Sequence, residues 1–273
     1  MKVLQILPQL NIGGVERGTL DLSKALIHKG HESFVISGGG ILVDELEQLG
    51  AKHYEIPVHI KSLRTLSLAK SLSETISSID PDIVHIRSRM PAWVNYRAFK
   101  MLQKKPLLVS TFHGLYSFPI YSKVMSFVDH SIAISKTVER YILENYKLDK
   151  GDITVIPRGC DPLEFNNEVI NPVDKANIIE EFPQIVGKKV LTIPGRITKW
   201  KGVAEFIDLL SLLDDNYHGL VVGPTAKSKK KYLNKLQYKV SSLNLEDKIT
   251  FTGSRRDIAN IYKISDIVFN LSQ

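Results

Sequence analysis

Residues 3–14 read VLQILPQLNIGG, and a helical pattern follows them as far as residue 29. The apolar run at 3–7 is typical of a buried strand, whereas Pro8 and the two glycines indicate a turn. Apolar residues from Val15 to Leu26 then recur near one face of a helix, which Gly30 ends. Strands that are apolar throughout and alternate with helices predict a parallel sheet covered on both faces. Further strands are predicted at 33–37, 53–56, 83–86, 107–111, 131–134 and 153–156, with a helical period near 3.6 over 63–79.

The alternation stops near residue 157 and starts again near residue 190. Residues 157–188 hold four prolines and many polar side chains, so we predict a first domain over 1–165 and a linker over 166–188. A second domain is predicted over 189–273. Because its last apolar run ends two residues before Gln273, this domain is expected to be incomplete and to have an exposed sheet edge. Its predicted strands are 190–193, 220–222, 249–252 and 267–271, and its predicted helices are 202–213, 229–243 and 258–264.

Composition limits the class of protein. The 273 residues are 43% hydrophobic and 24% charged, which excludes a disordered chain, a collagen-like repeat and a disulfide scaffold. The net charge of +7 is spread along the chain, whereas a nucleic-acid binder more often gathers its charge on one face. Two interpretations of the charge stay open, a mildly basic surface and an anionic partner such as a phosphorylated ligand or a membrane.

The single cysteine and the short apolar runs narrow the cellular setting. Cys160 has no second cysteine to pair with, and no run approaches the roughly 18 apolar residues of a membrane span. Residues 3–7 are too short for the apolar part of a signal peptide, and no small-residue cleavage site follows. We therefore expect a cytoplasmic protein.

The turn at Gly13 and Gly14 is the first candidate site. Glycines allow close approach of an anion, and the following helix offers unpaired N–H groups at its N-terminus. A dinucleotide site is an alternative, but it favours G-x-G-x-x-G and an acidic residue after the second strand, where this chain has SGGG at 37–40. A tight turn without a ligand is the third interpretation.

Basic residues follow two predicted strands at their carboxyl ends, where open α/β sheets bind ligands. Arg196, Lys199 and Lys201 could neutralise a phosphate, although a solvated loop explains them equally well. Arg87, Arg89 and Arg97 form a second basic group, suited to an acidic acceptor.

His113 and a row of lysines are weaker candidates. His113 follows the strand at 107–111 and faces the same predicted crevice, although most single histidines have structural or surface roles. Lys231, Lys235 and Lys239 form a row at four-residue spacing, which favours a solvated helix face over contact with anionic lipid.

The order of the motifs resembles that of the GT-B-fold glycosyltransferases of family 4, a group of retaining sugar transferases. The resemblance extends over the whole chain, and Arg158 departs from it because the family pattern usually has asparagine there. The motifs that carry it are GGVER at 13–17, PDIVH at 81–85, VIPRGCD at 155–161, GRITKWKG at 195–202, LVVG at 220–223 and FTG at 251–253.

The resemblance implies two Rossmann-like parallel-sheet domains that face each other across a cleft, with a nucleotide-diphospho-sugar as donor substrate and neither cofactor nor bound metal. His113 would contact the transferred sugar, and Arg196 and Lys201 would neutralise the donor diphosphate. The acceptor would be a glycan or a lipid-linked glycan of the bacterial surface or lipopolysaccharide type, and peripheral contact with an anionic membrane is a further option. The implied donor-binding residues are Gly13, Gly14, Arg196, Lys201, Gly223 and Arg255, and the implied acceptor-side residues are Glu16, Arg17, Arg87 and Arg89.

The family's E-x7-E element lies beyond the strand that here ends at Gln273. We therefore expect this form to be truncated and weak or inactive alone, because buried donor hydroxyls without partners cost about 1–3 kcal/mol each. Two other functions stay open at this point. One is a truncated, non-catalytic form that binds an anionic ligand or partner, and the other is a sugar-nucleotide epimerase of the same GT-B architecture.

Overall fold

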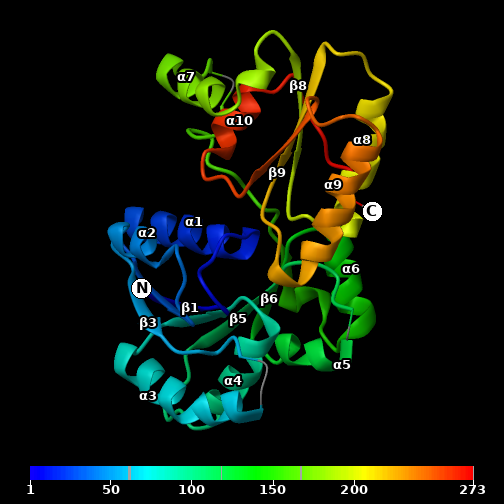
Figure 1. The fold of residues 1–273 in the computed structure, drawn as a ribbon. Helices are drawn as coiled ribbons and strands as arrows, with labels where there is room; N and C mark the ends of the chain where they lie inside the picture. The colour runs from blue at the N-terminus through cyan, green and yellow to red at the C-terminus, as the bar shows by residue number, and fades with distance from the viewer. Residues whose placement is uncertain (61–62, 118, 167, 273) are drawn as a thin grey trace. The chain divides into compact units, whose positions relative to one another are not determined.

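The computed structural model describes residues 1–60, 63–117, 119–166 and 168–272. The chain divides into two compact units, Met1–Gly159 and Cys160–Gln273. Each unit has a parallel sheet with helices packed against it, seven-stranded in the first unit and four-stranded in the second (Figure 1). The predicted α/β fold with two parallel-sheet domains is confirmed.

The sheet of the first unit has the strand order β3-β2-β1-β4-β5-β6-β7, and every pair is parallel. The order reverses next to β1, so β1 lies between the strands that come second and fourth along the chain. The strands are β1 (Lys2–Ile6), β2 (Glu32–Ser37), β3 (Lys52–Glu55), β4 (Ile83–Ile86), β5 (Leu107–Phe112), β6 (His130–Ala133) and β7 (Ile153–Val155).

The helices of this unit cover both faces of its sheet because alternate strand residues point to opposite sides. Phe34 and Ile36 of β2 pack in one apolar cluster with Leu72, while Val35 packs in another with Leu20. In Figure 1, α1 and α2 accordingly lie on one side of the sheet and α3 and α4 on the other. The helices are α1 (Gly14–His28), α2 (Val43–Gln48), α3 (Ala69–Ile79), α4 (Arg89–Phe99), α5 (Pro119–Ser122) and α6 (Lys136–Asn145), and a 3₁₀ segment, η1 (Leu63–Leu68), precedes α3.

The sheet of the second unit has the order β10-β9-β8-β11, again with all pairs parallel. Leu191 and Ile193 of β8 pack with Phe206 of α8 on one face, and Val190 packs with Ile178 of α7 on the other. Both faces are therefore covered. The elements are α7 (Pro172–Glu181), β8 (Lys189–Pro194), α8 (Val203–Ser211), β9 (Tyr217–Val222), α9 (Lys230–Ser242), β10 (Ile249–Gly253), α10 (Ile258–Ile264) and β11 (Ile267–Val268).

The segment predicted as a linker is folded. The second unit begins at Cys160, six residues before the predicted start of the linker at residue 166. Most of the predicted linker forms α7 and a 3₁₀ turn that begins at Pro183. Pro172 occupies the first turn of α7, where the missing N–H of proline costs nothing, and the Asn171 side chain accepts a hydrogen bond from the N–H of Val173. Pro172 and Pro183, which suggested a linker, therefore lie at the beginning of helical segments.

The edge of the second sheet is open, as its pattern predicted. β11 has two residues, Ile267 and Val268, which are 50% and 43% exposed. Among the described residues, β11 pairs only with β8. Its outer backbone groups thus have no neighbouring strand in that part of the chain.

The lysine row lies on α9. Lys231 and Lys235 are exposed, but Lys239 pairs with Asp208 at 2.6 Å and donates to the carbonyl of Ala204 at 3.1 Å. The end of the row thus fastens α9 to α8, which a purely solvated helix face would not do.

We predict that α7 contributes to the stability of the second unit. Ile178 is 2% exposed and Val173 on the same helix is 66% exposed. Ile178→Ala should lower the free energy of unfolding by about 2–5 kcal/mol because it leaves a cavity in the core. Urea unfolding followed by fluorescence of Trp200, in a Trp93→Phe background, measures this unit alone because the chain has two tryptophans.

Val173→Ala is the matched control and should change stability by no more than about 0.5 kcal/mol. Equal effects of the two substitutions would show that α7 does not pack as described.

Candidate functional site

The candidate site of the first unit lies where its strand order reverses, between β1 and β4. Connections leave these two strands in opposite directions, so a crevice opens at their carboxyl ends, where open α/β sheets bind ligands. The loop that carries Gly13 and Gly14 follows β1. Arg87 follows β4, and His113 follows the adjacent β5. Four of the residues selected from the sequence therefore lie at the carboxyl end of the same sheet. They are Gly13, Gly14, Arg87 and His113.

The two glycines at the start of α1 leave room for the ends of two long side chains. Gly13 has extended backbone angles, φ 179° and ψ 165°, which any residue can adopt. A Cβ on Gly13 would lie 2.3 Å from an oxygen of Glu16, and a Cβ on Gly14 would lie 2.6 Å from the Nη1 atom of Arg158. Among the described residues no side chain caps α1, so its first N–H groups are available to an anion.

Arg158 joins this loop to His113. Its Nη1 atom donates to the carbonyl of Gly14, and its Nη2 atom lies 3.1 Å from Nδ1 of His113. The sequence pointed to Arg158 only as a departure from a family pattern. Its partners lie 144 and 45 residues away along the chain, so no local pattern could identify the contact.

The imidazole of His113 is held neutral. Burial, together with the charges of Arg87 and Arg158, lowers its pKa to about 3. The Nε2 atom is buried and has no hydrogen-bond partner among the described residues. His113 can thus serve as a hydrogen-bonding group at neutral pH, but its low pKa makes it a poor general base.

Arg87, predicted on the acceptor side, lies in the interior of the first unit. The side chain is buried because the amide oxygen of Gln5, on the neighbouring strand β1, accepts its Nη1–H at 2.9 Å. The Gln5 amide in turn donates to Ser23 of α1 at 3.0 Å. Burial lowers the pKa of Arg87 to about 10, so the group still carries its charge at neutral pH. Its Nε atom has no partner in the described part of the chain.

The other residues predicted on the acceptor side interact with the protein itself. Arg17 pairs with Glu45 at 2.7 Å and with Asp21 at 3.4 Å. Glu16 lies in the first turn of α1 with its carboxylate folded over Gly13, where the helix dipole favours negative charge.

Arg89 is stacked on aromatic rings at the start of α4. Its guanidinium lies 4.7 Å from the ring centre of Tyr116 and 5.5 Å from that of Tyr121. Its Nη1 atom donates to the hydroxyl of Ser122 at 3.4 Å, and stacking on the rings leaves the edge of the guanidinium available for such hydrogen bonds.

The candidate site of the second unit also lies at a reversal of strand order, between β8 and β11. Arg196 follows β8, is exposed, and has no hydrogen-bond or ion-pair partner for its guanidinium within residues 168–272. Lys201 lies 4.4 Å from the ring centre of Trp200 and donates to Ser272 at 3.1 Å. Both cations stand just before α8, whose N-terminus adds a positive dipole.

Gly223 has a packing function in this loop. Its φ is +155°, and a Cβ there would lie 2.0 Å from the carbonyl oxygen of Gly195. The glycine therefore allows the segments after β8 and β9 to touch.

Arg255, predicted to bind the donor, has protein partners. Its guanidinium forms two hydrogen bonds with Asp257, at 2.8 and 2.7 Å, and one with Glu181 of α7. Two carboxylates already compensate its charge, and they raise its pKa above the usual range. We assign Arg255 a structural role that fastens α7 to the segment before α10.

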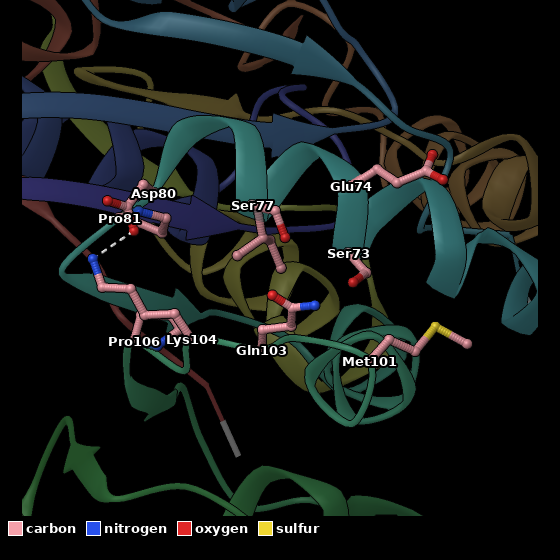
Figure 2. Close-up of a pocket in the computed structure, with 10 residues that line it drawn as sticks. Ser73, Glu74, Ser77, Asp80, Pro81, Met101, Gln103, Lys104 and Pro106 are labelled. Carbon is pink, nitrogen blue, oxygen red and sulfur yellow. Dashed lines mark hydrogen bonds and ion pairs between the residues drawn. The ribbon is translucent and has the colours of Figure 1, made fainter.

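A pocket lies at the opposite end of the first sheet. Its lining includes Ser73 and Ser77 of α3, residues 80–81 before β4, and Gln103, Lys104 and Pro106 before β5 (Figure 2). Lys104 and Asp80 form an ion pair at 2.7 Å across it. The pocket therefore contains none of the candidate residues.

The described residues contain neither a cluster of metal ligands nor a membrane-spanning helix. No three of the His, Cys, Asp and Glu side chains found there gather as metal ligands would. No helix in that part of the chain combines the length and the apolar character of a membrane-spanning segment.

Comparison with known proteins gives consistent matches. Residues 12–163 match the family described as Glycosyltransferase Family 4, and residues 174–273 match Glycosyl transferases group 1. A glycosyltransferase from Rickettsia africae ESF-5 has 34% sequence identity and a TM-score of 0.83, and the alignment covers 99% of this chain and 73% of that protein.

Two more distant proteins have the same fold or sequence pattern. The Anabaena protein HepE, solved in complex with UDP and glucose, has a TM-score of 0.85 at 20% identity, over 100% of this chain and 74% of its own. N-acetyl-alpha-D-glucosaminyl L-malate synthase from Bacillus anthracis is 24% identical over 96% of this chain and 71% of its own length.

We predict that His113 makes the first unit sensitive to acid. An unfolded chain takes up a proton on this residue below about pH 6.5, but the folded unit does not until about pH 3. Stability attributable to His113 is therefore complete above pH 6.5 and is lost as the pH falls towards 3. His113→Gln should make the decline of unfolding free energy between about pH 6.5 and 4 shallower, by up to about 1.4 kcal/mol per pH unit.

Urea unfolding at several pH values, followed by Trp93 in a Trp200→Phe background, measures this slope. His28→Gln, at an exposed site on α1, is the control and should leave the slope unchanged. An identical slope in His113→Gln and the wild type would contradict the assignment.

Proposed function

The chain belongs to glycosyltransferase family 4, and from that membership we propose a retaining transfer reaction that uses a nucleotide-diphospho-sugar as donor. A hexose-type sugar would move from the donor to a hydroxyl of a glycan or lipid-linked acceptor. The observation that carries the proposal is the unpaired guanidinium of Arg196, which stands beside Lys201 at the strand reversal of the second unit.

A diphosphate matches the charge of this loop. Arg87, Arg158 and Arg255 are held by protein partners, but Arg196 is exposed and its donors face no acceptor in the described residues. Arg196 can bind two phosphate oxygens at once, and Lys201 adds a second positive charge next to the N-terminus of α8. The Anabaena protein solved with UDP and glucose supports a uridine nucleotide as the first donor to test.

The cations would act on the leaving group. In the proposed step, the bond between the anomeric carbon and the phosphate oxygen breaks, and a bond to the acceptor oxygen forms on the same face. The proton of the acceptor hydroxyl passes to the departing phosphate oxygen. Positive charge that is already in place stabilises the diphosphate as its negative charge develops, so Arg196 and Lys201 would supply the charge that a metal supplies in other transferases.

The strand reversal of the first unit has groups that suit a sugar and an anion. His113 is neutral and has a buried Nε2 atom with no partner among the described residues, which suits a hydrogen bond with a sugar oxygen. The uncapped start of α1 at Gly13 and Gly14 suits an anion.

A lipid-linked acceptor is consistent with the surface after β5. Leu115 and Ile120 are 61% and 91% exposed, and they flank Tyr116, which is stacked on Arg89. Exposed apolar side chains beside a cation and aromatic rings suit the interface of an anionic membrane. We therefore keep a bacterial surface glycan or lipopolysaccharide as the proposed acceptor and peripheral membrane contact as part of the proposal.

Neutralising Arg196 or Lys201 should remove donor binding and turnover. We expect Arg196→Met and Lys201→Met each to weaken UDP binding roughly 10- to 100-fold, because a hydrogen bond to a charged group contributes about 1.5–3 kcal/mol. Turnover of a nucleotide-sugar should fall by about 10²–10³-fold. Calorimetric titration with UDP and hydrolysis assays on UDP-, GDP- and ADP-sugars measure the two effects.

Lys235→Met, at an exposed position on α9, is the matched control and should behave as the wild type. Donor isomerisation without an acceptor would identify an epimerase, and binding of UDP without any turnover would identify a non-catalytic form. Retained UDP affinity in Arg196→Met would overturn the proposed diphosphate site.

The proposed chemistry also predicts the product and the requirement for metal. An α-linked donor should give an α-linked product, which the anomeric proton coupling in an NMR spectrum reports. Turnover should be the same in excess EDTA, because protein cations would neutralise the diphosphate. Inversion of configuration, or a loss of activity that added Mg²⁺ restores, would contradict this mechanism.

A further inference from the structure

The contact between Arg158 and His113 fixes where the imidazole carries its proton. A guanidinium has five N–H donors and no acceptor. Its Nη2 atom lies 3.1 Å from Nδ1 of His113, so a hydrogen bond at this distance requires a lone pair on Nδ1. A neutral imidazole has one N–H group, and the proton must then be on Nε2.

No other hydrogen bond in the described residues competes for the ring. Nε2 is buried and without a partner. The neighbouring side chain of Arg87 acts on His113 through its charge, but Arg87 donates to Gln5 and His85 bonds to Thr111, so neither forms a hydrogen bond with the His113 ring. Nδ1 protonation would point an N–H group at the N–H groups of Arg158, which is unfavourable. The tautomer therefore depends on one side chain.

Arg158 is itself held at a second point. Its Nη1 atom donates to the carbonyl of Gly14 in the first turn of α1, and Gly14 cannot carry a Cβ without meeting Nη1 at 2.6 Å. A planar guanidinium that spans two acceptors has a fixed orientation. One side chain thus links the ends of β1, β5 and β7, the three strands after which Gly14, His113 and Arg158 lie.

We propose that Arg158 is a positioning residue that locks His113 in the Nε2–H tautomer and presents this N–H group to an oxygen of the ligand. The role in the reaction rests on the proposed function, whereas the tautomer follows from the contact itself. The asparagine of the family pattern would not fix the ring in this way, because an amide offers both a donor and an acceptor. We therefore expect the lock to be a particular property of chains with arginine at this position.

Reversing the polarity of the contact tests the proposal. A carboxylate accepts but does not donate, so Arg158→Glu should favour a proton on Nδ1, the opposite of the wild type. Arg158→Met, which neither donates nor accepts, should allow both tautomers. Long-range proton–nitrogen NMR on the full chain with ¹⁵N-labelled histidine distinguishes the two forms, and His113→Gln identifies the His113 signals among the eight histidines.

The wild type should show the Nε2–H pattern alone, unchanged between about pH 5 and 8 where an ordinary histidine titrates. Arg140→Glu makes the same charge change at an exposed position on α6 and should leave the His113 signals as they are. If Arg158→Glu does not fold, Arg158→Met provides the same test.

A wild-type spectrum with the proton on Nδ1 would overturn the proposal, and so would an unchanged tautomer in both Arg158 variants. Neither result depends on a nucleotide-sugar. Failure of UDP binding or turnover in the wild type would count against the proposed function alone.

Discussion

Parallel pairing of β1 on both sides is the constraint on which the first unit depends. A strand with parallel neighbours at both edges requires crossover connections, and the helices in those connections cover the two faces of the sheet. The polypeptide leaves β1 and β4 in opposite directions, and Gly14 after β1 and His113 after the adjacent β5 lie at the carboxyl end of the same sheet. The second unit repeats the arrangement with β8 and β11. Its loop of cations occupies the corresponding position.

Cationic side chains that have partners within the protein differ from those that are available to bind a ligand. Arg87 is buried against the amide of Gln5, and Arg255 is paired with two carboxylates. Arg89 lies against aromatic rings. A charge that the fold already compensates gains less from a ligand than one that faces water without a partner. By this criterion Arg196 is better suited to a diphosphate than Arg87, Arg89 or Arg255.

The sequence predicts those features that depend on neighbours along the chain. Short apolar runs placed all eleven strands to within a few residues, because burial on both faces leaves an unmistakable pattern. The pattern does not predict the helix over residues 172–181, because Pro172 and Pro183 indicate a linker. Proline in a first helical turn instead favours a helix. The sequence does not predict contacts between residues that are far apart along the chain. The burial of Arg87 depends on Gln5, 82 residues away, and the single hint was a glutamine within an apolar strand.

The exposed edge at β11 separates two ways in which the second unit can change. A ladder of strands grows sideways through its backbone groups, whereas a ligand meets the sheet at the ends of its strands. A strand from the same chain or from another protein could therefore pair with Ile267 and Val268 while Arg196 keeps its place after β8. Enlargement of the sheet and refinement of its chemistry can thus proceed independently in evolution.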